Sequence, residues 1–466
     1  MAKHGGILRR RDFLASAAGA AATGAMPRWP LAAESSSPLF AGEGVVDITP
    51  PLGIELGGFH RTPGNERRVK GIRQPTAARA LVLRLGGTEV AICSLDVAGV
   101  GREMSSRIRA QVARDVGIPA ENVRVCATHT HSMPNFCYTR QWGSVPVDYM
   151  AVVEKKTVEA VRLAKADAAP AEVSLGKSRA RGGNHNRTTR TFKTDEHFGK
   201  DSGDNERWLD TTVHALLFHR PGGKRTLLWY HFSAHSVCYA DDLAGPDWPG
   251  EVADLLRQHE KLEASFLQGH IGDVNPGDGR DWRGEIKQTV QAIYPAVRQA
   301  IEAARPVKID RLQTVRREFR APLDIARFKD WLARYEKDPA QCASGEWVDA
   351  GFAADWFRGN AHRRLDETHL PMTTSALALG PIGMAFHPAE LYSCYGLAIR
   401  RDSPFADTLV VGYADDIVGY LPDPNAYQAG EYAAIVVPKI LDYPPFTPTA
   451  ARAFTAAAVE LLKAVA

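Results

Sequence analysis

Short apolar runs alternate with amphipathic stretches along most of this chain. The apolar runs are rich in β-branched and aliphatic residues, which predicts buried strands. They cover residues 45–48, 80–85, 90–95, 123–128, 213–218, 226–232, 375–379, 382–386 and 408–411. Gly86-Gly87 and Gly380-Pro381 each separate two neighbouring runs, so we expect hairpins at both places.

Helical periodicity is clearest near residue 290. Ile286, Val290, Ile293, Val297 and Ile301 recur at spacings of three and four residues, which predicts an amphipathic helix. We expect further helices over residues 102–116, 149–164 and 249–260, and from Thr449 onward. Strands that alternate with helices predict an α/β fold, in which a layered core of mixed β-sheets is flanked by helices.

Two segments do not fit this alternation. Residues 179–205 are rich in Gly, Asn, Arg and Thr without any period, which is typical of a long functional loop. Residues 310–370 are more polar, and we expect them to be a helical insertion or a lid.

The N-terminus has the order of an export signal. Arg10-Arg11-Asp12-Phe13-Leu14 is a twin-arginine pattern, and an Ala/Gly-rich, weakly apolar run follows it. We therefore expect residues 1–33 to be a twin-arginine signal peptide and the mature protein to be periplasmic or extracellular. Residues 34–466 are expected to form the functional domain.

Charge and cysteine usage narrow the function classes. The net charge is +3, but residues 1–33 carry five basic side chains and one acidic one, so the remainder is close to −1. A nearly neutral body argues against binding to nucleic acid. The six cysteines contain no CxxC pair, and export of a folded chain implies folding in a reducing compartment, so we expect most of them to be small buried hydrophobes.

Two histidines follow the apolar run at residues 123–128. In Thr128-His129-Thr130-His131-Ser132, residues i and i+2 of a strand would share one face. Both imidazoles would then project together, as a metal site or a proton-transfer site needs. The alternative is two unrelated histidines, one packed and one solvated.

The strand over residues 226–232 leads into His235, and strand ends are where α/β enzymes place functional groups. We expect His235 to be a ligand and His231 to be a core histidine. Asp273, in the turn Gly272-Asp273-Val274-Asn275-Pro276, either orients a ligand histidine or caps its own turn. Glu390 follows another apolar strand and a proline turn.

In this order, these segments resemble the neutral/alkaline, non-lysosomal ceramidases and their relatives, over most of the chain after the signal. The most specific match is Thr128-His129-Thr130-His131-Ser132. The other matching segments are Ile48-Thr49-Pro50-Pro51-Leu52-Gly53, residues 79–83, Ser94-Leu95-Asp96, Asn186-Arg187, His235, residues 272–276, Glu390 and the Tyr420 to Tyr432 spacing.

The resemblance implies one zinc ion held by His129, His235, Glu390 and Tyr420. It also implies that His131, Arg187 and Tyr432 belong to the active site. A zinc site at strand ends with two imidazoles and a carboxylate is chemically reasonable, whereas a phenol ligand is unusual.

The chain departs from the family pattern at two points. Ser132-Met133-Pro134-Asn135 stands where the family usually has Ser-Gly-Pro-Gly, so we expect side chains beside the metal to alter the pocket. A C-terminal immunoglobulin-like domain is not expected, because the sequence ends in a helix near Ala466.

The sequence therefore predicts zinc-dependent hydrolysis of an N-acyl amide, with ceramide (N-acylsphingosine) as the type substrate giving sphingosine and a fatty acid. Partners would be an N-acyl lipid or another acylated amine, with peripheral membrane contact. His131 is the candidate for proton transfer to the leaving amine, with Glu390 as a second candidate, and Tyr432 or Arg187 would stabilise the oxyanion. The alternatives are a zinc hydrolase of a different acylated amine or ester, and an exported zinc-binding protein without catalysis.

Overall fold

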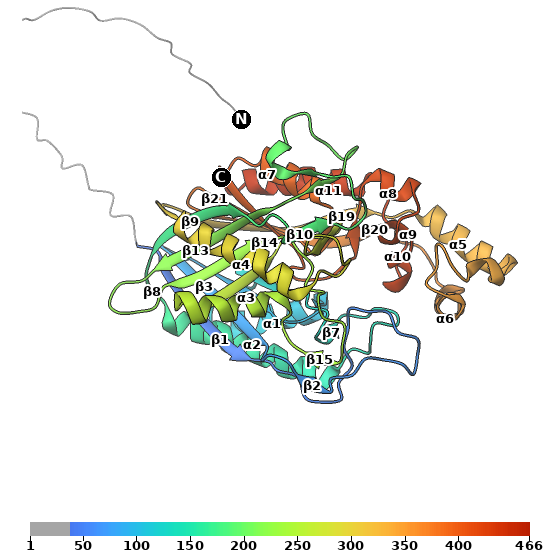
Figure 1. Cartoon of the computed structure of the whole chain (residues 1–466), viewed down its shortest axis with the longest axis horizontal. Coiled ribbons are helices and arrows are strands. Elements are labelled where there is room, and N and C mark those ends of the chain that lie inside the picture. The colour runs from blue at the N-terminus through green and yellow to red at the C-terminus, as the bar shows by residue number, and fades with distance from the viewer. Residues whose placement is uncertain (1–37) are drawn as a thin grey trace, which may run out of the picture. The chain divides into compact units, whose positions relative to one another are not determined.

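A computed structural model describes residues 38–466, and the predicted signal segment lies outside the described residues. Three sheets of five, five and four strands form the centre of this part of the chain (Figure 1). Most neighbouring strands are antiparallel, but each sheet contains one parallel pair. The prediction of an α/β fold with mixed sheets flanked by helices is confirmed.

The order of the strands in space differs from their order in the sequence in the first two of the three sheets, but not in the third. The first sheet consists of β6 (Val123–Ala127), β4 (Thr88–Leu95), β3 (Ala77–Leu85), β1 (Phe40–Asp47) and β8 (Ala169–Pro170). The second consists of β16 (Ala264–Gln268), β14 (Leu227–Phe232), β13 (Thr212–His219), β9 (Glu172–Arg179) and β18 (Arg305–Val307). The third consists of β19 (Leu312–Pro322), β20 (His369–Leu379), β21 (Ile382–Phe386) and β23 (Asp407–Val411).

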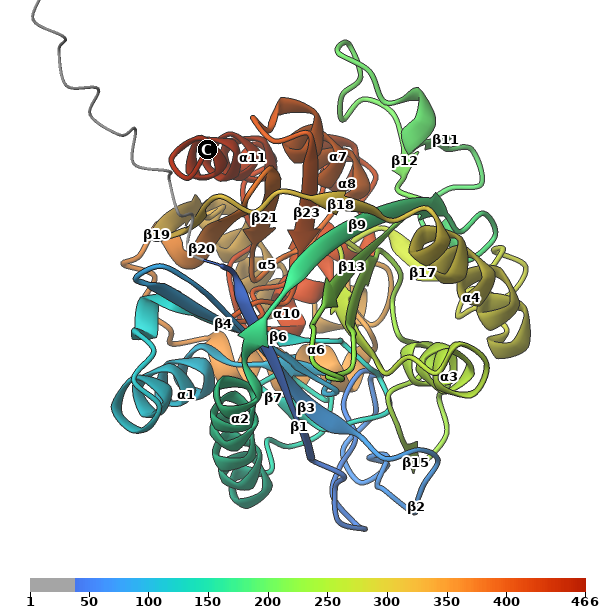
Figure 2. The ribbon, with the colours of Figure 1, turned by 90° about the vertical axis from the view of Figure 1, so that its left-hand side faces the viewer.

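A pair of helices covers the outer face of each sheet (Figure 2). These pairs are α1 (Arg102–Asp115) with α2 (Val147–Asp167), α3 (Trp248–Leu255) with α4 (Ile286–Glu302), and α7 (Ser393–Asp402) with α11 (Ala450–Lys463). The predicted helix over residues 249–260 is α3 continued by a π-helical turn, Leu256–Glu260. The remaining helices are α5 (Ile325–Lys337), α6 (Ala350–Asn360), α8 (Pro424–Gln428), α9 (Tyr432–Ile435) and α10 (Val437–Ile440).

The inner faces of the three sheets share one apolar core. Alternate residues of a strand point to opposite faces, so Leu81 and Leu83 of β3 enter this shared core, whereas Ala80 and Val82 pack under α1 and α2. Trp229 of β14 and Leu377 of β20 enter the same central cluster from the other two sheets. Burial on both faces explains why these strands read as continuous apolar runs.

The parallel pair of each sheet ends near the same place. The pairs are β4–β6, β14–β16 and β21–β23. The candidate residues His129, His235 and Glu390 follow β6, β14 and β21, each within a few positions of the strand's last residue. Packing of the three sheets on one core thus brings residues that are far apart in the sequence to one point.

The expectation that residues 310–370 are a helical insertion is only partly correct. Leu312–Pro322 is an edge strand that pairs with β20 along its whole length. Charged side chains on this exposed edge hide its strand character in the sequence, and such charges protect edge strands from pairing with other chains. The helical part consists of α5, α6 and the turn between them.

This helical part is packed firmly against the body. Lys439 of α10 is buried, and its ammonium lies 3.6 Å from the ring centre of Trp331 and 4.5 Å from that of Trp347. The same ammonium donates hydrogen bonds to the backbone carbonyls of Glu346 and Ile435. Cation–π contacts and two hydrogen bonds offset only part of the cost of burying this charge, and burial lowers the pKa of Lys439 well below its usual value.

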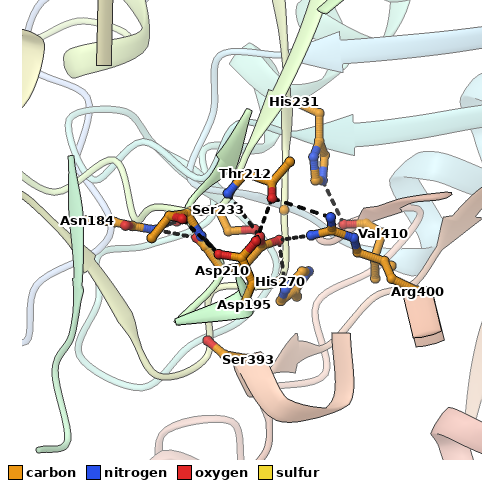
Figure 3. Close-up of polar contacts among 12 residues, drawn as sticks. Asn184, Asp195, Asp210, Thr212, His231, Ser233, His270, Ser393, Arg400 and Val410 are labelled. Carbon is orange, nitrogen blue, oxygen red and sulfur yellow. Dashed lines mark hydrogen bonds and ion pairs between the residues drawn. The ribbon is translucent and has the colours of Figure 1, made fainter. Parts of the chain in front are cut away.

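A buried polar network joins the second and third sheets (Figure 3). Asp210 accepts a hydrogen bond of 2.8 Å from Arg400 of α7 and lies 3.3 Å from Nε2 of His270. His231 of β14 donates from Nε2 to the carbonyl of Val410 in β23, at 2.9 Å. The prediction that His231 is a core histidine is confirmed.

Two further findings concern the described residues as a whole. All six cysteines are free, and four of them are buried. Within residues 38–466, no helix has both the length and the apolar character needed to cross a bilayer.

The buried histidines predict that acid destabilises the fold. Burial lowers the pKa of His231 and of His270 to about 4 each, although Asp210 partly opposes this at His270. An unfolded histidine, with a pKa near 6.5, takes up a proton that the folded one refuses, so stability is lost as pH falls from about 6.5 toward 4. Each histidine contributes up to about 3 kcal/mol to this loss.

Urea unfolding between pH 7.5 and 4.5, with a chelator present, measures this dependence. We expect the midpoint to fall steadily with pH, and to fall less steeply in His231→Gln. His219→Gln, at the exposed end of β13, is the matched control and should keep the wild-type slope. Equal midpoints at both ends of the range would contradict the assignment.

Candidate metal centre

The two histidines of the His-Thr-His segment do not lie on a strand. Strand β6 ends at Ala127, and His129 has a φ of 59°, in the left-handed region. Thr130 forms an isolated parallel bridge with Ser236, and the amide of His131 donates to the Ser236 carbonyl at 2.9 Å. The prediction that the imidazoles converge is correct, but a turn brings them together rather than strand alternation.

Three imidazoles meet at this turn. The Nε2 atoms of His129 and His131 are 3.1 Å apart, and the rings of His129 and His235 lie 5.1 Å apart. One ring nitrogen from each of His129, His131 and His235 lies within 4.8 Å of the other two, and all three side chains are buried. This group can hold a metal ion.

Backbone carbonyls determine which nitrogens are free to bind a metal. His129 Nδ1 lies 2.6 Å from the Ala98 carbonyl, and His235 Nδ1 lies 2.7 Å from the Val274 carbonyl. A carbonyl can only accept, so both Nδ1 atoms carry the proton and both Nε2 atoms present a lone pair. His235 Nε2 is buried without a hydrogen-bond partner among the described residues, which suits a metal ligand.

Glu390 adds a carboxylate to the imidazoles. Its Oε2 lies 3.4 Å from His235 Nε2 and accepts a hydrogen bond of 3.0 Å from the Tyr413 hydroxyl. Burial alone would raise its pKa, but cationic partners on the imidazole side, here the protonated forms of His235 and His129, lower the pKa of Glu390 to about 2. The group is therefore an ionised carboxylate in a buried site, as a metal ligand must be.

Tyr420 lies beside Glu390 because two short strands pair. In the parallel pair β22 (Glu390–Leu391) and β24 (Tyr420–Leu421), Glu390 stands opposite Tyr420. The Tyr420 hydroxyl accepts a hydrogen bond of 2.6 Å from Arg187. Burial raises the pKa of the Tyr420 phenol well above its usual value, against the lowering effect of Arg187.

Arg187 is held by the loop that the sequence predicts at residues 179–205. This segment contains a short strand, β10 (Asn184–Asn186), paired with β17 (Val274–Pro276). Arg187 follows it directly, and its guanidinium donates to the Gly272 carbonyl at 2.8 Å as well as to Tyr420. Burial would lower its pKa, but Tyr420 and Glu390 raise the pKa of Arg187 above its usual value, so it is a fixed cation.

A cavity of about 450 Å³ opens onto these residues. Its polar lining includes His131, Arg187, His235 and Tyr420, and much of the rest is aromatic or apolar. Tyr432 and Trp282 also line it, with 45% and 59% of their surfaces exposed. The seven predicted site residues are thus brought to one place, although Tyr432 stands apart from the buried group, with its ring centre 6.4 Å from that of Tyr420.

The suggestion that Asp273 orients a ligand histidine is wrong. Its carboxylate accepts hydrogen bonds from the amide and hydroxyl of Ser393 and from the side chain of Asn186. It therefore ties the segment after Glu390 to the residue before Arg187. His235 is oriented instead by the backbone carbonyl of Val274, the residue that follows Asp273.

Met133 and Asn135 do not shape the cavity as expected. Met133 is fully buried in the core between the first sheet and its helices. Asn135 donates to the Cys137 carbonyl and to the Thr139 hydroxyl. Neither residue lines the cavity, because the turn after His131 directs both side chains into the protein.

Sequence reasoning missed Tyr413. Its ring stacks on His129 with a centre-to-centre distance of 4.0 Å, and its hydroxyl reaches Glu390. The available signal was its position two residues after the buried strand β23, at the same strand ends as the other site residues.

The geometry predicts that His235→Ala abolishes tight metal binding, because it removes a buried lone pair that no other described side chain replaces. Loss of affinity should exceed the roughly 10- to 100-fold typical of residues that only support a ligand. Zinc titration with a competing chelator measures this. His185→Gln is the control, since His185 is also a buried histidine near a carbonyl but lies outside the group. Unchanged zinc affinity in His235→Ala would contradict the assignment.

Four of the seven predicted site residues lie in a region that matches a known protein family. The family "Neutral/alkaline non-lysosomal ceramidase, N-terminal" matches residues 40–308, which include His129, His131, Arg187 and His235. A neutral ceramidase of Mycobacterium tuberculosis is 29% identical over 266 residues, which cover 51% of this chain and 40% of the relative. The matched region thus spans about two fifths of that relative's length.

Solved structures show the same fold over a longer stretch. The crystal structure of neutral ceramidase from Pseudomonas aeruginosa has a TM-score of 0.70 at 19% identity, covering 92% of this chain and 74% of that one. A structure described as ceramidase complexed with C2 has a TM-score of 0.69 at 19% identity, covering 92% and 75%. The family model matches more than half of the length of this chain, and the chain therefore belongs to the neutral/alkaline non-lysosomal ceramidase family.

Proposed function

We propose that the protein is a zinc-dependent hydrolase that cleaves the amide bond of an N-acyl lipid, with a ceramide-like molecule as its substrate. The observation that carries this proposal is the buried group of three imidazoles, next to an ionised carboxylate, at a largely apolar cavity. Membership of the ceramidase family supports the reaction class and the lipid substrate.

The proposed zinc ligands are His129, His235, Glu390 and Tyr420. Imidazole and carboxylate ligands suit zinc, and the carbonyl partners of both Nδ1 atoms leave the Nε2 atoms facing the site. When bound, a zinc ion acts as a Lewis acid toward an acyl carbonyl and makes water a stronger acid at neutral pH.

His131 is proposed to deliver a proton to the leaving amine. It lines the cavity, and its Nδ1 is buried without a hydrogen-bond partner among the described residues. Its Nε2 faces His129, so a role as a further metal ligand is the competing assignment. Arg187, a fixed cation on the cavity wall, would stabilise negative charge on the acyl oxygen, and Tyr432 would be the second donor for that charge.

The cavity walls suit an acyl chain. Phe59, Trp142 and Val237 provide apolar surface on the cavity wall, and the exposed rings of Trp282 and Tyr432 also border it. Exposed aromatic rings are common where proteins meet a membrane surface, so we propose peripheral contact with a lipid surface here. We also propose that the protein is exported by the twin-arginine route to the periplasm or the exterior.

Release of fatty acid from a substrate panel tests the reaction. The zinc-loaded protein should hydrolyse ceramides, and activity should disappear with a chelator and in His235→Ala. The panel includes other N-acyl lipids, soluble acylated amines and esters. Release from those substrates alone would replace the ceramide assignment. No release from any of them, with zinc bound, would favour a binding protein without catalysis.

His131→Gln separates the two roles of His131. Loss of a general acid typically costs about 10²- to 10⁴-fold in rate, so we expect kcat to fall by that factor while zinc affinity stays within a few-fold of the wild type. Zinc titration and steady-state kinetics on the same preparation give both values. Loss of zinc in this variant would instead make His131 a ligand.

A further inference from the structure

Tyr413 contacts two of the proposed zinc ligands at once. Its ring is stacked on His129 with an angle of 22° between the planes and 4.0 Å between the centres. Its hydroxyl donates to Glu390 Oε2 at 3.0 Å. The side chain is fully buried, so neither contact competes with solvent.

The two ligands that Tyr413 contacts come from different sheets. His129 follows β6 of the first sheet, whereas Glu390 follows β21 of the third. Tyr413 itself follows β23, which pairs with β21, and its ring reaches across to His129. One side chain therefore fixes the separation between a ligand of the first sheet and a ligand of the third.

The backbone holds Tyr413 in this position. Its φ is 53°, which is unusual for a residue other than glycine and is close to the φ of 59° at His129. Its carbonyl accepts a hydrogen bond from Ala127, and Ala414 forms a bridge with Cys126. The left-handed conformation costs free energy for a residue with a side chain, and here two such residues lie next to each other. Strained backbone of this kind is common at functional sites, where the surrounding contacts hold it in place.

We propose that Tyr413 is a positioning residue of the metal site: its ring sets the plane of His129 and its hydroxyl sets the orientation of the Glu390 carboxylate. It has no place on the cavity lining, so it acts through these ligands and not on substrate. The inference rests on the proposed function, because it requires that His129 and Glu390 bind zinc.

Two substitutions at Tyr413 distinguish the ring contact with His129 from the hydrogen bond to Glu390. Tyr413→Phe keeps the stacked ring and removes the hydrogen bond to Glu390, whereas Tyr413→Leu removes both. Tyr395→Phe is the matched control. The Tyr395 hydroxyl also donates from a buried ring to a carboxylate, that of Asp204 at 2.6 Å, but among the described residues this side chain has no hydrogen bond or ring contact to a proposed zinc ligand.

Zinc affinity, measured by competition with a chromophoric chelator, is the deciding readout. Supporting residues of metal ligands are typically worth 10- to 100-fold, so Tyr413→Phe should bind zinc about 10- to 100-fold more weakly and Tyr413→Leu more weakly still. Tyr395→Phe should stay within about twofold of the wild type. At saturating zinc, Tyr413→Phe should lower kcat and leave KM unchanged.

Urea unfolding of the metal-free proteins separates positioning from general stability. We expect Tyr413→Phe and Tyr395→Phe to lose similar stability without metal, while only the former loses zinc affinity. Wild-type zinc affinity in Tyr413→Phe, with the wild type binding zinc and releasing fatty acid, would overturn this proposal alone. A wild-type protein that binds no zinc would overturn both proposals. If Tyr413→Leu does not fold, Tyr413→Phe decides the question.

Discussion

The candidate site depends on the packing of three sheets against one shared apolar core. Leu81, Trp229 and Leu377 meet there from separate sheets, and no sheet could bury its inner face alone. This packing fixes where the strands end. The parallel pair of each sheet stops at the same region, so residues that follow β6, β14 and β21 converge without any sequence proximity.

Backbone carbonyls then set the chemistry of the converging side chains. The Ala98 and Val274 carbonyls fix the tautomers of His129 and His235. Burying several imidazoles beside a carboxylate is costly unless a proton or a cation satisfies their lone pairs. A site with this composition therefore favours a bound cation, and its assembly couples metal affinity to the folded arrangement of the sheets.

The surrounding segments complete the cavity from independent parts of the chain. Asp273 joins the Arg187 loop to the segment that follows Glu390. The helical segment with α5 and α6 is anchored by Lys439, and His60, which lines the cavity, contacts Phe352 of α6. The segment therefore packs behind His60 and supports the cavity lining from outside, although none of its own residues lines the cavity.

The sequence by itself determined the α/β class and most strands and helices, because apolar periodicity is a local property. Local pattern alone drew attention to His129, His131 and His235, whereas Arg187, Tyr420 and Tyr432 were named through the resemblance to the ceramidases. The sequence could not show that β19 is a strand, since the charges of an exposed edge conceal the pattern. Only the tertiary structure decided that a left-handed turn joins His129 to His131, that Met133 points into the core, and that Tyr413 links His129 to Glu390. These features depend on contacts between different sheets, and such contacts leave no periodic trace in the chain.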